Sequence, residues 1–253
     1  TFEDGKILLG HTKDGRLIGI DDNRHIATIA GSRAGKTATC LLPNWLTWTG
    51  SVLAIDPKGE LAMNTAEHRA KMGQDVIILD PFNEVGRTAP DVAAKYAKRF
   101  DPHSEIKAGK VDDVIDDAAL IADALIIPDT HGDDHWSLGA KNLVRGLILW
   151  AMAQEAEGKG TAALNQVRKW LMMPADTDNV DDPKLTLRDL FGDMMDSDAF
   201  EGVISGVGGT MSGKSEKELS SIISVAVEQT AFLDSKPMHD HLAASDFPSL
   251  RVL

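Results

Sequence analysis

The stretch HIATIAGSRAGKT, residues 25–37, constrains the fold more than any other part of the chain. Its first six residues are mostly apolar or β-branched, which is typical of a strand buried in a parallel sheet. A short loop with two glycines follows, and the apolar spacing favours a helix over residues 36–48. A strand, a loop ending in Lys-Thr and a helix form an arrangement that wraps phosphates with backbone N–H groups. The stretch therefore predicts a phosphate-binding loop.

The loop departs from the pattern G-x-x-x-x-G-K-[ST] at one position, where Ala30 replaces the first glycine. A small side chain fits there if the backbone φ stays negative. We expect the loop N–H groups and the helix dipole to bind the α and β phosphates of ATP, Lys36 to reach the β and γ phosphates, and Thr37 to ligate Mg²⁺. The alternative is a glycine-rich turn without a ligand. The expected nucleotide-binding residues are Gly31, Ser32, Arg33, Ala34, Gly35, Lys36, Thr37 and Ala38.

A second stretch, GGTMSGKS at residues 208–215, matches the pattern letter for letter. It lacks a convincing preceding strand and lies among helical segments, so the physical context of a phosphate loop is missing. We expect a flexible approach to a helix that Ser212 or Ser215 caps, with Glu216 and Glu218 at its positive end.

The pattern of elements changes near residue 84. Before it, strand-like runs alternate with helical ones, which predicts an α/β fold with a parallel sheet and crossover helices. After it, the apolar spacing favours helices throughout. We therefore expect a nucleotide-binding α/β domain over 1–83, an all-α domain over 84–235 and a return to the first domain over 236–253. The expected strands are 6–10, 16–20, 25–30, 51–56 and 75–80, and the expected helices are 36–48, 60–72, 111–126, 136–157, 162–173, 186–195 and 215–233.

Two aspartates end predicted strands, at the edge of the sheet where open α/β folds bind ligands. Asp56 is a candidate ligand of Mg²⁺ or water, and Asp80 a weaker one, although either can cap the following helix instead. Glu60 is a candidate for polarising a water, or simply favours the start of a helix. The candidate catalytic residues are thus Lys36, Asp56 and Glu60, and the candidate metal ligands are Thr37 and Asp56.

Other polar and aromatic residues have a functional and a structural interpretation. Arg33 either senses the γ-phosphate or pairs with a carboxylate, and Lys58 either touches a phosphate on a neighbouring subunit or is simply exposed. Trp45 and Trp48 either stack on adenine or pack in a core. The run HGDDH at 131–135 favours a helix cap over a metal site.

Charge is spread unevenly along the chain. The net charge is −13, and residues 84–234 hold 15 Lys and Arg against 27 Asp and Glu, a net of −12. Such acidity argues against a general electrostatic grip on nucleic acid. A single cysteine, Cys40, excludes a disulfide within the chain and suits a reducing compartment. The longest apolar stretch is too short to cross a bilayer.

The motifs around residues 25–83 resemble the nucleotide-binding domain of the type IV coupling proteins, the TraG-type ATPases of conjugation and type IV secretion. The resemblance rests on AGSRAGKT, LLPNWLTWTGSVLAIDPKGEL and GQDVIILDPF, and continues more weakly through HWSLGAKNLVRGLILW and SEKELSSIISVAVEQTAFL. It implies a RecA-like sheet domain with an inserted all-α domain.

The resemblance also implies partners and a location. Members are membrane-anchored ring ATPases, with a hexamer expected, at the cytoplasmic face of the bacterial inner membrane. They deliver relaxase–DNA complexes or effector proteins to inner-membrane components of a secretion channel, and an accessory protein or cargo is expected to bind the all-α domain.

Two features of the family are missing from residues 1–253: the N-terminal membrane anchor and the later apolar strand that ends in Asp-Glu. We therefore expect a piece of a longer protein that has no ATPase activity by itself. The alternatives are a nucleotide-dependent adaptor that does not hydrolyse ATP, and a DNA motor of the FtsK/HerA type.

Overall fold

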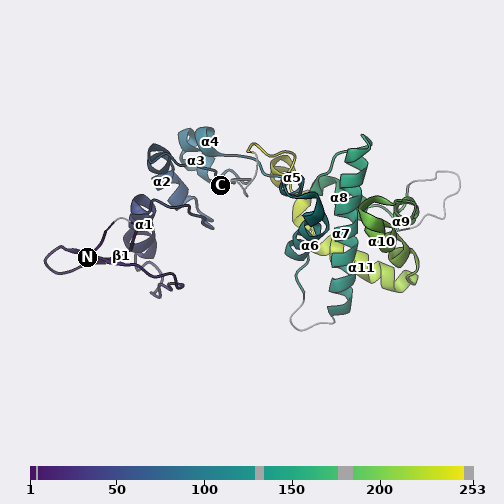
Figure 1. Cartoon of the computed structure of the whole chain (residues 1–253), viewed down its shortest axis with the longest axis horizontal. Coiled ribbons are helices and arrows are strands. Elements are labelled where there is room, and N and C mark those ends of the chain that lie inside the picture. The colour runs from purple at the N-terminus through teal and green to yellow at the C-terminus, as the bar shows by residue number, and fades with distance from the viewer. Residues whose placement is uncertain (4, 129–133, 176–184, 248–253) are drawn as a thin grey trace. The chain divides into compact units, whose positions relative to one another are not determined.

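The computed structural model describes residues 1–3, 5–128, 134–175 and 185–247. The chain divides into two compact units, a first over residues 1–98 and a second that begins at Arg99. Figure 1 labels β1 and helices α1 to α11 of the two units. The division differs from the boundary expected at residue 84, because two short helices after that residue pack with the first unit. The expected domain limits stay a prediction.

The first unit holds a β-hairpin and several helices. The expected strands 6–10 and 16–20 are confirmed as β1 and β2, which pair antiparallel as a hairpin, and Gly15 adopts φ +84° in the turn between them. The expected helices over 36–48 and 60–72 are also confirmed. The elements are β1 (Ile7–His11), β2 (Leu17–Ile20), the π-helix η1 (Thr37–Leu41), α1 (Leu42–Thr47), α2 (Glu60–Lys71), α3 (Glu84–Thr88) and α4 (Pro90–Tyr96).

The segments 25–30, 51–56 and 75–80 form no ladder with one another in the described part of the chain. Ile78 alone makes an isolated parallel bridge, with Ala97. The side chains of Ile29, Leu53 and Ile55 are more than nine-tenths exposed, although a parallel sheet would bury them. A strand depends on its neighbours for hydrogen bonds, and apart from the Ile78 bridge these segments have no such neighbours among the described residues. The parallel sheet therefore stays a prediction.

The core of the first unit lies where α2, α3 and α4 meet. Ala66 of α2, Val85 of α3 and Ile78 are its buried members. Val85 also packs against the turn before α2, since a Cβ on Gly59 would lie 2.6 Å from its Cγ2. Gly59 adopts φ +67°, so this position needs glycine for two reasons.

Helices are the regular secondary structure of the second unit in its described residues. All five helices expected between 111 and 233 are present, which confirms those predictions. The elements are α5 (His103–Ala108), η2 (Val111–Asp113), α6 (Val114–Leu125), α7 (Asp134–Ala156), α8 (Leu164–Leu171), α9 (Leu187–Met195), η3 (Ala199–Gly202), α10 (Val203–Ser212), α11 (Glu216–Gln229), η4 (Ala231–Asp234) and α12 (Lys236–His241).

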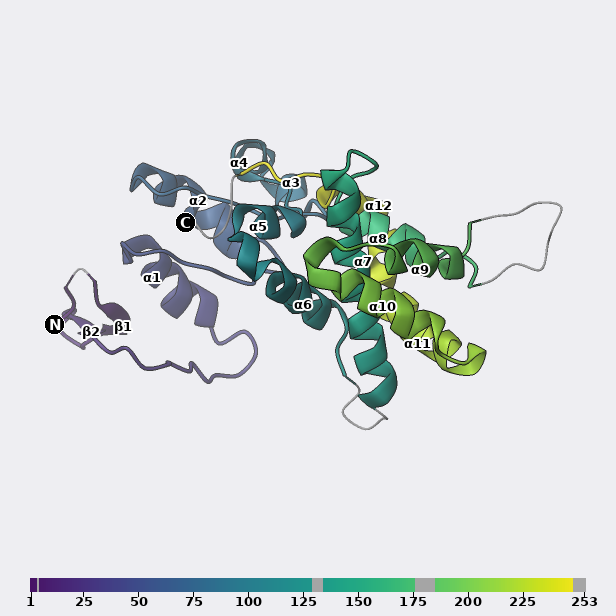
Figure 2. The same ribbon diagram turned by 45° about the vertical axis from the view of Figure 1, so that its right-hand side comes forward.

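Helix α7 forms the centre of the second unit, with α6, α8, α10 and α11 packed against it. Figures 1 and 2 show α7 running through the helical unit among these helices. Two glycines on α7 allow close approach: a Cβ on Gly139 would meet Ile222 of α11 at 2.7 Å, and one on Gly146 would meet Val207 of α10 at 2.5 Å. None of the helices in the described residues has both the length and the apolar composition to cross a bilayer.

The two ends of the helical unit are tied together. The backbone N–H of Arg99 donates to Asp246 Oδ2 at 2.8 Å, and its guanidinium Nη2 donates to Oδ1 at 2.8 Å. Phe100 stacks on Phe247 with ring centroids 5.7 Å apart. The chain therefore enters and leaves this unit at adjacent points.

Candidate nucleotide-binding site

The loop before η1 has the backbone conformations of a tight turn. Arg33 and Gly35 adopt φ +60° and +81°, both in the left-handed region. Glycine takes this conformation at little cost, whereas Arg33 is strained unless its surroundings hold it there. A Cβ on Gly31 would meet nothing within 4 Å, so the loop is open on that side.

The polar groups of the loop suit a bound anion. Among the described residues, no acceptor is found for the backbone N–H groups of Ser32, Arg33, Gly35 and Lys36. Lys36 Nζ donates to the carbonyl oxygens of Ala30 at 2.8 Å and Gly31 at 2.9 Å, which holds the ammonium against the loop. Free N–H donors beside a cation are what a phosphate chain requires. The loop therefore fits the phosphates of ATP.

Ala30 contributes to the loop through its carbonyl oxygen. That oxygen accepts a hydrogen bond from Lys36. The contact uses the backbone and not the side chain, so it does not require a glycine at this position. The replacement of the first glycine by alanine is compatible with this geometry.

A cavity of about 300 Å³ adjoins the start of η1. It brings together three of the predicted site residues, Thr37, Asp56 and Glu60, with Lys58 beside them. The other loop residues, including Lys36, do not line it. A hydroxyl and a carboxylate at one cavity are ligands of the kind that Mg²⁺ accepts, so the residues present fit the metal; metal binding by Thr37 and Asp56 stays a prediction.

Asp56 caps helix α2. Its Oδ1 accepts from the backbone N–H of Glu60 at 3.1 Å, and its Oδ2 accepts from Leu61 at 2.8 Å and Ala62 at 3.0 Å. This is the structural alternative that the sequence left open. A carboxylate has about four acceptor positions, so the cap leaves capacity for a metal ion or water.

Asp80 caps α3 in the same way, with its oxygens accepting from the N–H groups of Glu84, Val85 and Gly86 at 2.7 to 3.3 Å. It does not line the cavity beside Thr37. The structure thus gives Asp80 a role in starting a helix.

Sequence reasoning missed a positioning residue, Arg69 on α2. This side chain is buried, and its guanidinium donates to the carbonyl oxygens of Trp45 at 2.9 Å, Trp48 at 2.6 Å and Gly50 at 2.7 Å. Burial lowers the pKa of the Arg69 guanidinium. Leu61, Thr65 and Arg69 are spaced four residues apart and share the buried face of α2. This spacing in the sequence could have indicated that Arg69 is buried.

Arg69 holds the C-terminal end of α1 beside α2, because its acceptors lie at the end of α1 and just beyond it. Trp45 and Trp48 are half-buried. Asn44 fixes the other side of α1: its side chain pairs with the backbone N–H and C=O of Leu8, at 2.7 and 2.8 Å. The helix after the loop is therefore anchored to both the hairpin and α2.

The second glycine-rich stretch, residues 208–215, has a different structure. Residues up to Ser212 belong to α10, with Gly208 and Met211 buried, so the expected flexible approach is wrong. The expected cap is confirmed at Ser215, whose hydroxyl accepts from the Glu218 N–H in a capping box at the start of α11. Buried helical packing explains Gly208, because a Cβ there would lie 2.7 Å from the Phe191 carbonyl oxygen.

The HGDDH run lies partly outside the described residues, which resume at Asp134. Helix α7 begins there, so the expected helix after this run is confirmed. In the ranges that the structure describes, no group of three His, Cys, Asp or Glu side chains is arranged to hold a metal ion.

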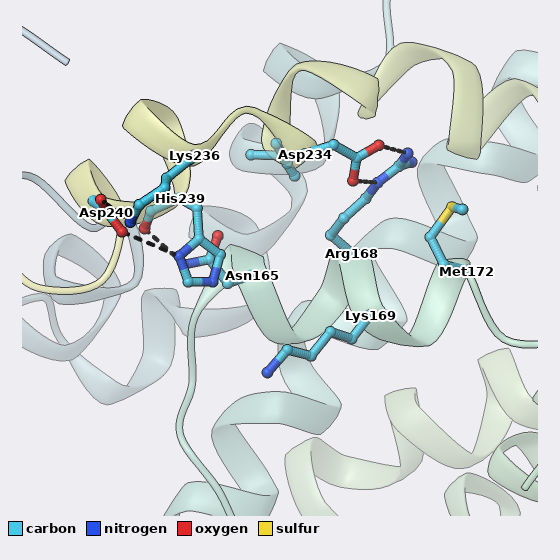
Figure 3. A pocket seen from close by; sticks show the side chains of 9 residues that line it. Asn165, Arg168, Lys169, Met172, Asp234, Lys236, His239 and Asp240 are labelled. Carbon is cyan, nitrogen blue, oxygen red and sulfur yellow. Dashed lines mark hydrogen bonds and ion pairs between the residues drawn. The ribbon is translucent and has the colours of Figure 1, made fainter. Parts of the chain in front are cut away.

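A second cavity, of about 590 Å³, lies in the helical unit between α8 and the η4–α12 region. Figure 3 shows Arg168 paired with Asp234 on one side and Lys236 with His239 near Asp240 on the other. Two of its three lysine and arginine side chains, Arg168 and Lys236, already have an acidic partner. Its charges are thus largely balanced within the unit.

Comparison with known proteins matches residues 2–252 to one family, described as "Type IV secretory system Conjugative DNA transfer". Two conjugal transfer proteins TraG of Escherichia coli are each 28% identical to the chain, over 88% and 93% of its length. The type IV secretion system-coupling protein VirD4 of Bartonella henselae is 43% identical over 58 residues, 22% of this chain and 9% of that protein. The chain spans about a third of the length of the two TraG relatives.

Proposed function

The chain belongs to the family of type IV secretory system conjugative DNA transfer proteins, and from this premise we propose that it is the ATP-binding part of a coupling protein. In this function, the first unit binds ATP and Mg²⁺, and the longer protein uses the nucleotide to power delivery of a DNA–protein or protein substrate to a secretion channel.

The proposed binding of ATP rests mainly on the loop over residues 31–37. Its N–H groups at four positions have no acceptor among the described residues, and Lys36 lies against the same loop. Thr37, the next residue, shares a cavity with Asp56. This arrangement supports a role for the loop in binding phosphates and for Thr37 in binding Mg²⁺.

Titration of a fluorescent ATP analogue tests the proposed binding of ATP. Wild-type protein should bind the analogue in the presence of Mg²⁺, and the Lys36→Ala variant should bind it about tenfold or more weakly. Binding that is unchanged in this variant would contradict the assignment of the loop.

The proposed location and assembly follow from the relatives. VirD4 of Bartonella henselae is by name a coupling protein of a type IV secretion system, and the TraG relatives are conjugal transfer proteins. We infer a homo-oligomeric ring at the cytoplasmic face of the inner membrane, in contact with inner-membrane components of the channel.

The helical unit is proposed to recognise the partner, which is a relaxase–DNA complex, an accessory protein or an effector. Residues 84–234, most of which belong to this unit, carry a net charge of −12, which repels phosphate backbones and attracts basic protein segments. Recognition through a basic segment of the partner therefore fits this unit better than a grip on bare DNA.

The salt dependence of the association rate tests the proposed recognition of a basic partner. The association rate of a cognate basic accessory protein with the whole chain should fall as the ionic strength rises beyond about 0.15 M, where the Debye length is about 8 Å. Poly-lysine of matched charge is the control for attraction without recognition. The whole chain carrying Lys36→Ala should not retard the migration of DNA in a gel at low salt. A clear shift would contradict the charge argument.

A further inference from the structure

The first unit contains two turns of the same construction. One spans residues 56–60, with the sequence DPKGE, and the other spans residues 80–84, with the sequence DPFNE. Each starts with Asp-Pro and ends in a Glu that begins a helix, α2 or α3. The fourth residue is left-handed in both, with φ +67° at Gly59 and +60° at Asn83.

The hydrogen bonds of the two turns correspond as well. In each, the aspartate carboxylate accepts from the backbone N–H groups four, five and six residues later. These bonds explain why each turn begins with an aspartate. The left-handed backbone explains why the fourth residue is Gly or Asn, because both tolerate this conformation. The second turn is therefore a control, within the same chain, for what the backbone requires.

The third position differs between the turns. It is Lys58 in the first and Phe82 in the second, and both side chains are exposed. Since the same turn forms around either residue, the turn does not require a lysine. The presence of Lys58 therefore needs another explanation.

Lys58 lines the cavity that also contains Thr37 and Asp56. Within the described part of the chain, its ammonium has no hydrogen-bond acceptor and no ion-pair partner. Lys58 borders this cavity beside the carboxylates of Asp56 and Glu60. Because it makes no ion pair among the described residues, its charge is available to an anionic ligand.

Resting on the nucleotide site proposed above, we propose that Lys58 contacts the γ-phosphate of the bound triphosphate and so gives the site its preference for ATP over ADP. In a phosphate-binding loop, the hydroxyl that follows the loop lysine would hold the Mg²⁺ that accompanies the terminal phosphates. Thr37 occupies that position, so a side chain sharing its cavity lies at the terminal end of the triphosphate. Lys36 and the loop N–H groups serve the rest of the phosphate chain.

Binding of ATP and of ADP, each with Mg²⁺, to the whole chain tests the proposal by calorimetry. Lys58→Phe gives the first turn the residue that the second turn already accommodates, so the fold should be kept. We expect this variant, and Lys58→Ala, to bind ATP about tenfold more weakly, the loss typical of one charged hydrogen bond, and ADP almost as well as wild type. Lys58→Arg should retain the preference for ATP.

The matched control is Lys71→Ala, which removes an exposed lysine from the last turn of α2 and should change neither affinity. Equal weakening of ATP and ADP by Lys58→Phe, or no weakening of either, would overturn the role of Lys58 while leaving the nucleotide site intact. A wild-type chain that binds neither nucleotide would overturn the site itself, and the role of Lys58 with it.

Discussion

At the scale of single residues, buried arginines connect parts of the chain that are distant in sequence. Arg168 of α8 donates through Nη1 to the Val227 carbonyl oxygen at 2.7 Å and to Thr230 Oγ1 at 3.0 Å. Its Nε donates to Asp234 Oδ1 at 2.8 Å. This guanidinium lowers the pKa of the Asp234 carboxyl, chiefly through the side-chain hydrogen bond. One side chain thus joins α8 to the C-terminal end of α11 and to η4.

Replacing this arginine should destabilise the helical unit. Arg168→Met keeps an apolar stem but leaves the Val227 carbonyl and the Thr230 hydroxyl without their charged donor, and losing such bonds costs about 1.5–3 kcal/mol. Urea unfolding followed by far-UV circular dichroism measures the change. Lys236→Met is the control, because its ion pair with Asp240 is exposed and should contribute nothing measurable. Equal midpoints for the two variants would contradict the role of Arg168.

The contacts of these arginines could not be predicted from the sequence. Arg168 finds its acceptors about sixty residues away, and Arg69 finds its acceptors 19 to 24 residues away. By contrast, the loop over residues 31–37 could be recognised because its pattern is local. The capping roles of Asp56 and Asp80 were foreseen as alternatives, since a strand-end Asp before a helix has a local consequence.

At the scale of elements, the start of α11 is fixed by its capping box. The Ser215 hydroxyl donates to Glu218 Oε2 at 3.1 Å, and the Glu218 N–H donates back to that hydroxyl at 3.4 Å. The hydrogen bond from Ser215 is the main cause of the lowered pKa of Glu218. The cap thus ties helix stability to the charge of one carboxyl.

Removing the cap should change both stability and titration. Because the pKa of Glu218 is lower in the folded state, the associated stabilisation is present above the unfolded value of about 4.3 and is lost as the pH falls through the folded pKa. Ser215→Ala should raise this pKa towards its ordinary value and cost about 1 kcal/mol at neutral pH. NMR titration of the Glu218 carboxyl and urea unfolding at several pH values measure these effects.

The control for the cap is Ser221→Ala, also on α11, whose hydroxyl donates within the helix to the Lys217 carbonyl. It should leave the titration of Glu218 unchanged. An unshifted pKa in Ser215→Ala would show that the capping box does not set it.

Helices were more predictable than strands for a physical reason. A helix satisfies its hydrogen bonds within one segment, so the periodicity of residues 111–126 or 215–233 sufficed to locate α6 and α11. The hairpin of β1 and β2 has its partner a short turn away. The segments 25–30, 51–56 and 75–80 require neighbours from distant parts of the sequence, and local patterning carries no information about where these lie.

At the scale of the whole molecule, the chain combines two units with different chemistry. The first has a loop whose N–H groups at four positions have no acceptor in the described part of the chain, with Lys36 at its end and a cavity beside it. The second is a helical unit with its own core around α7. Family membership could be inferred from local motifs in the first unit, and it holds across residues 2–252.

The central claim is that the phosphate loop is the imperfect match at 30–37 rather than the perfect match at 208–215. Lys36 lies in a loop whose N–H groups at four positions have no acceptor within the described ranges, whereas Lys214 lies between two helices with its ammonium 3.8 Å from Glu218 Oε1. Each lysine supplies the matched control for the other, because both substitutions remove one charge from the same pattern.

Titration of a fluorescent ATP analogue with Mg²⁺ into Lys36→Ala and Lys214→Ala tests this claim most directly. Loss of a charged phosphate contact costs about 1.5–3 kcal/mol, so Lys36→Ala should weaken binding about tenfold or more, while Lys214→Ala should bind like wild type. Circular dichroism confirms that both variants are folded. Weakened binding in Lys214→Ala together with wild-type affinity in Lys36→Ala would contradict the claim.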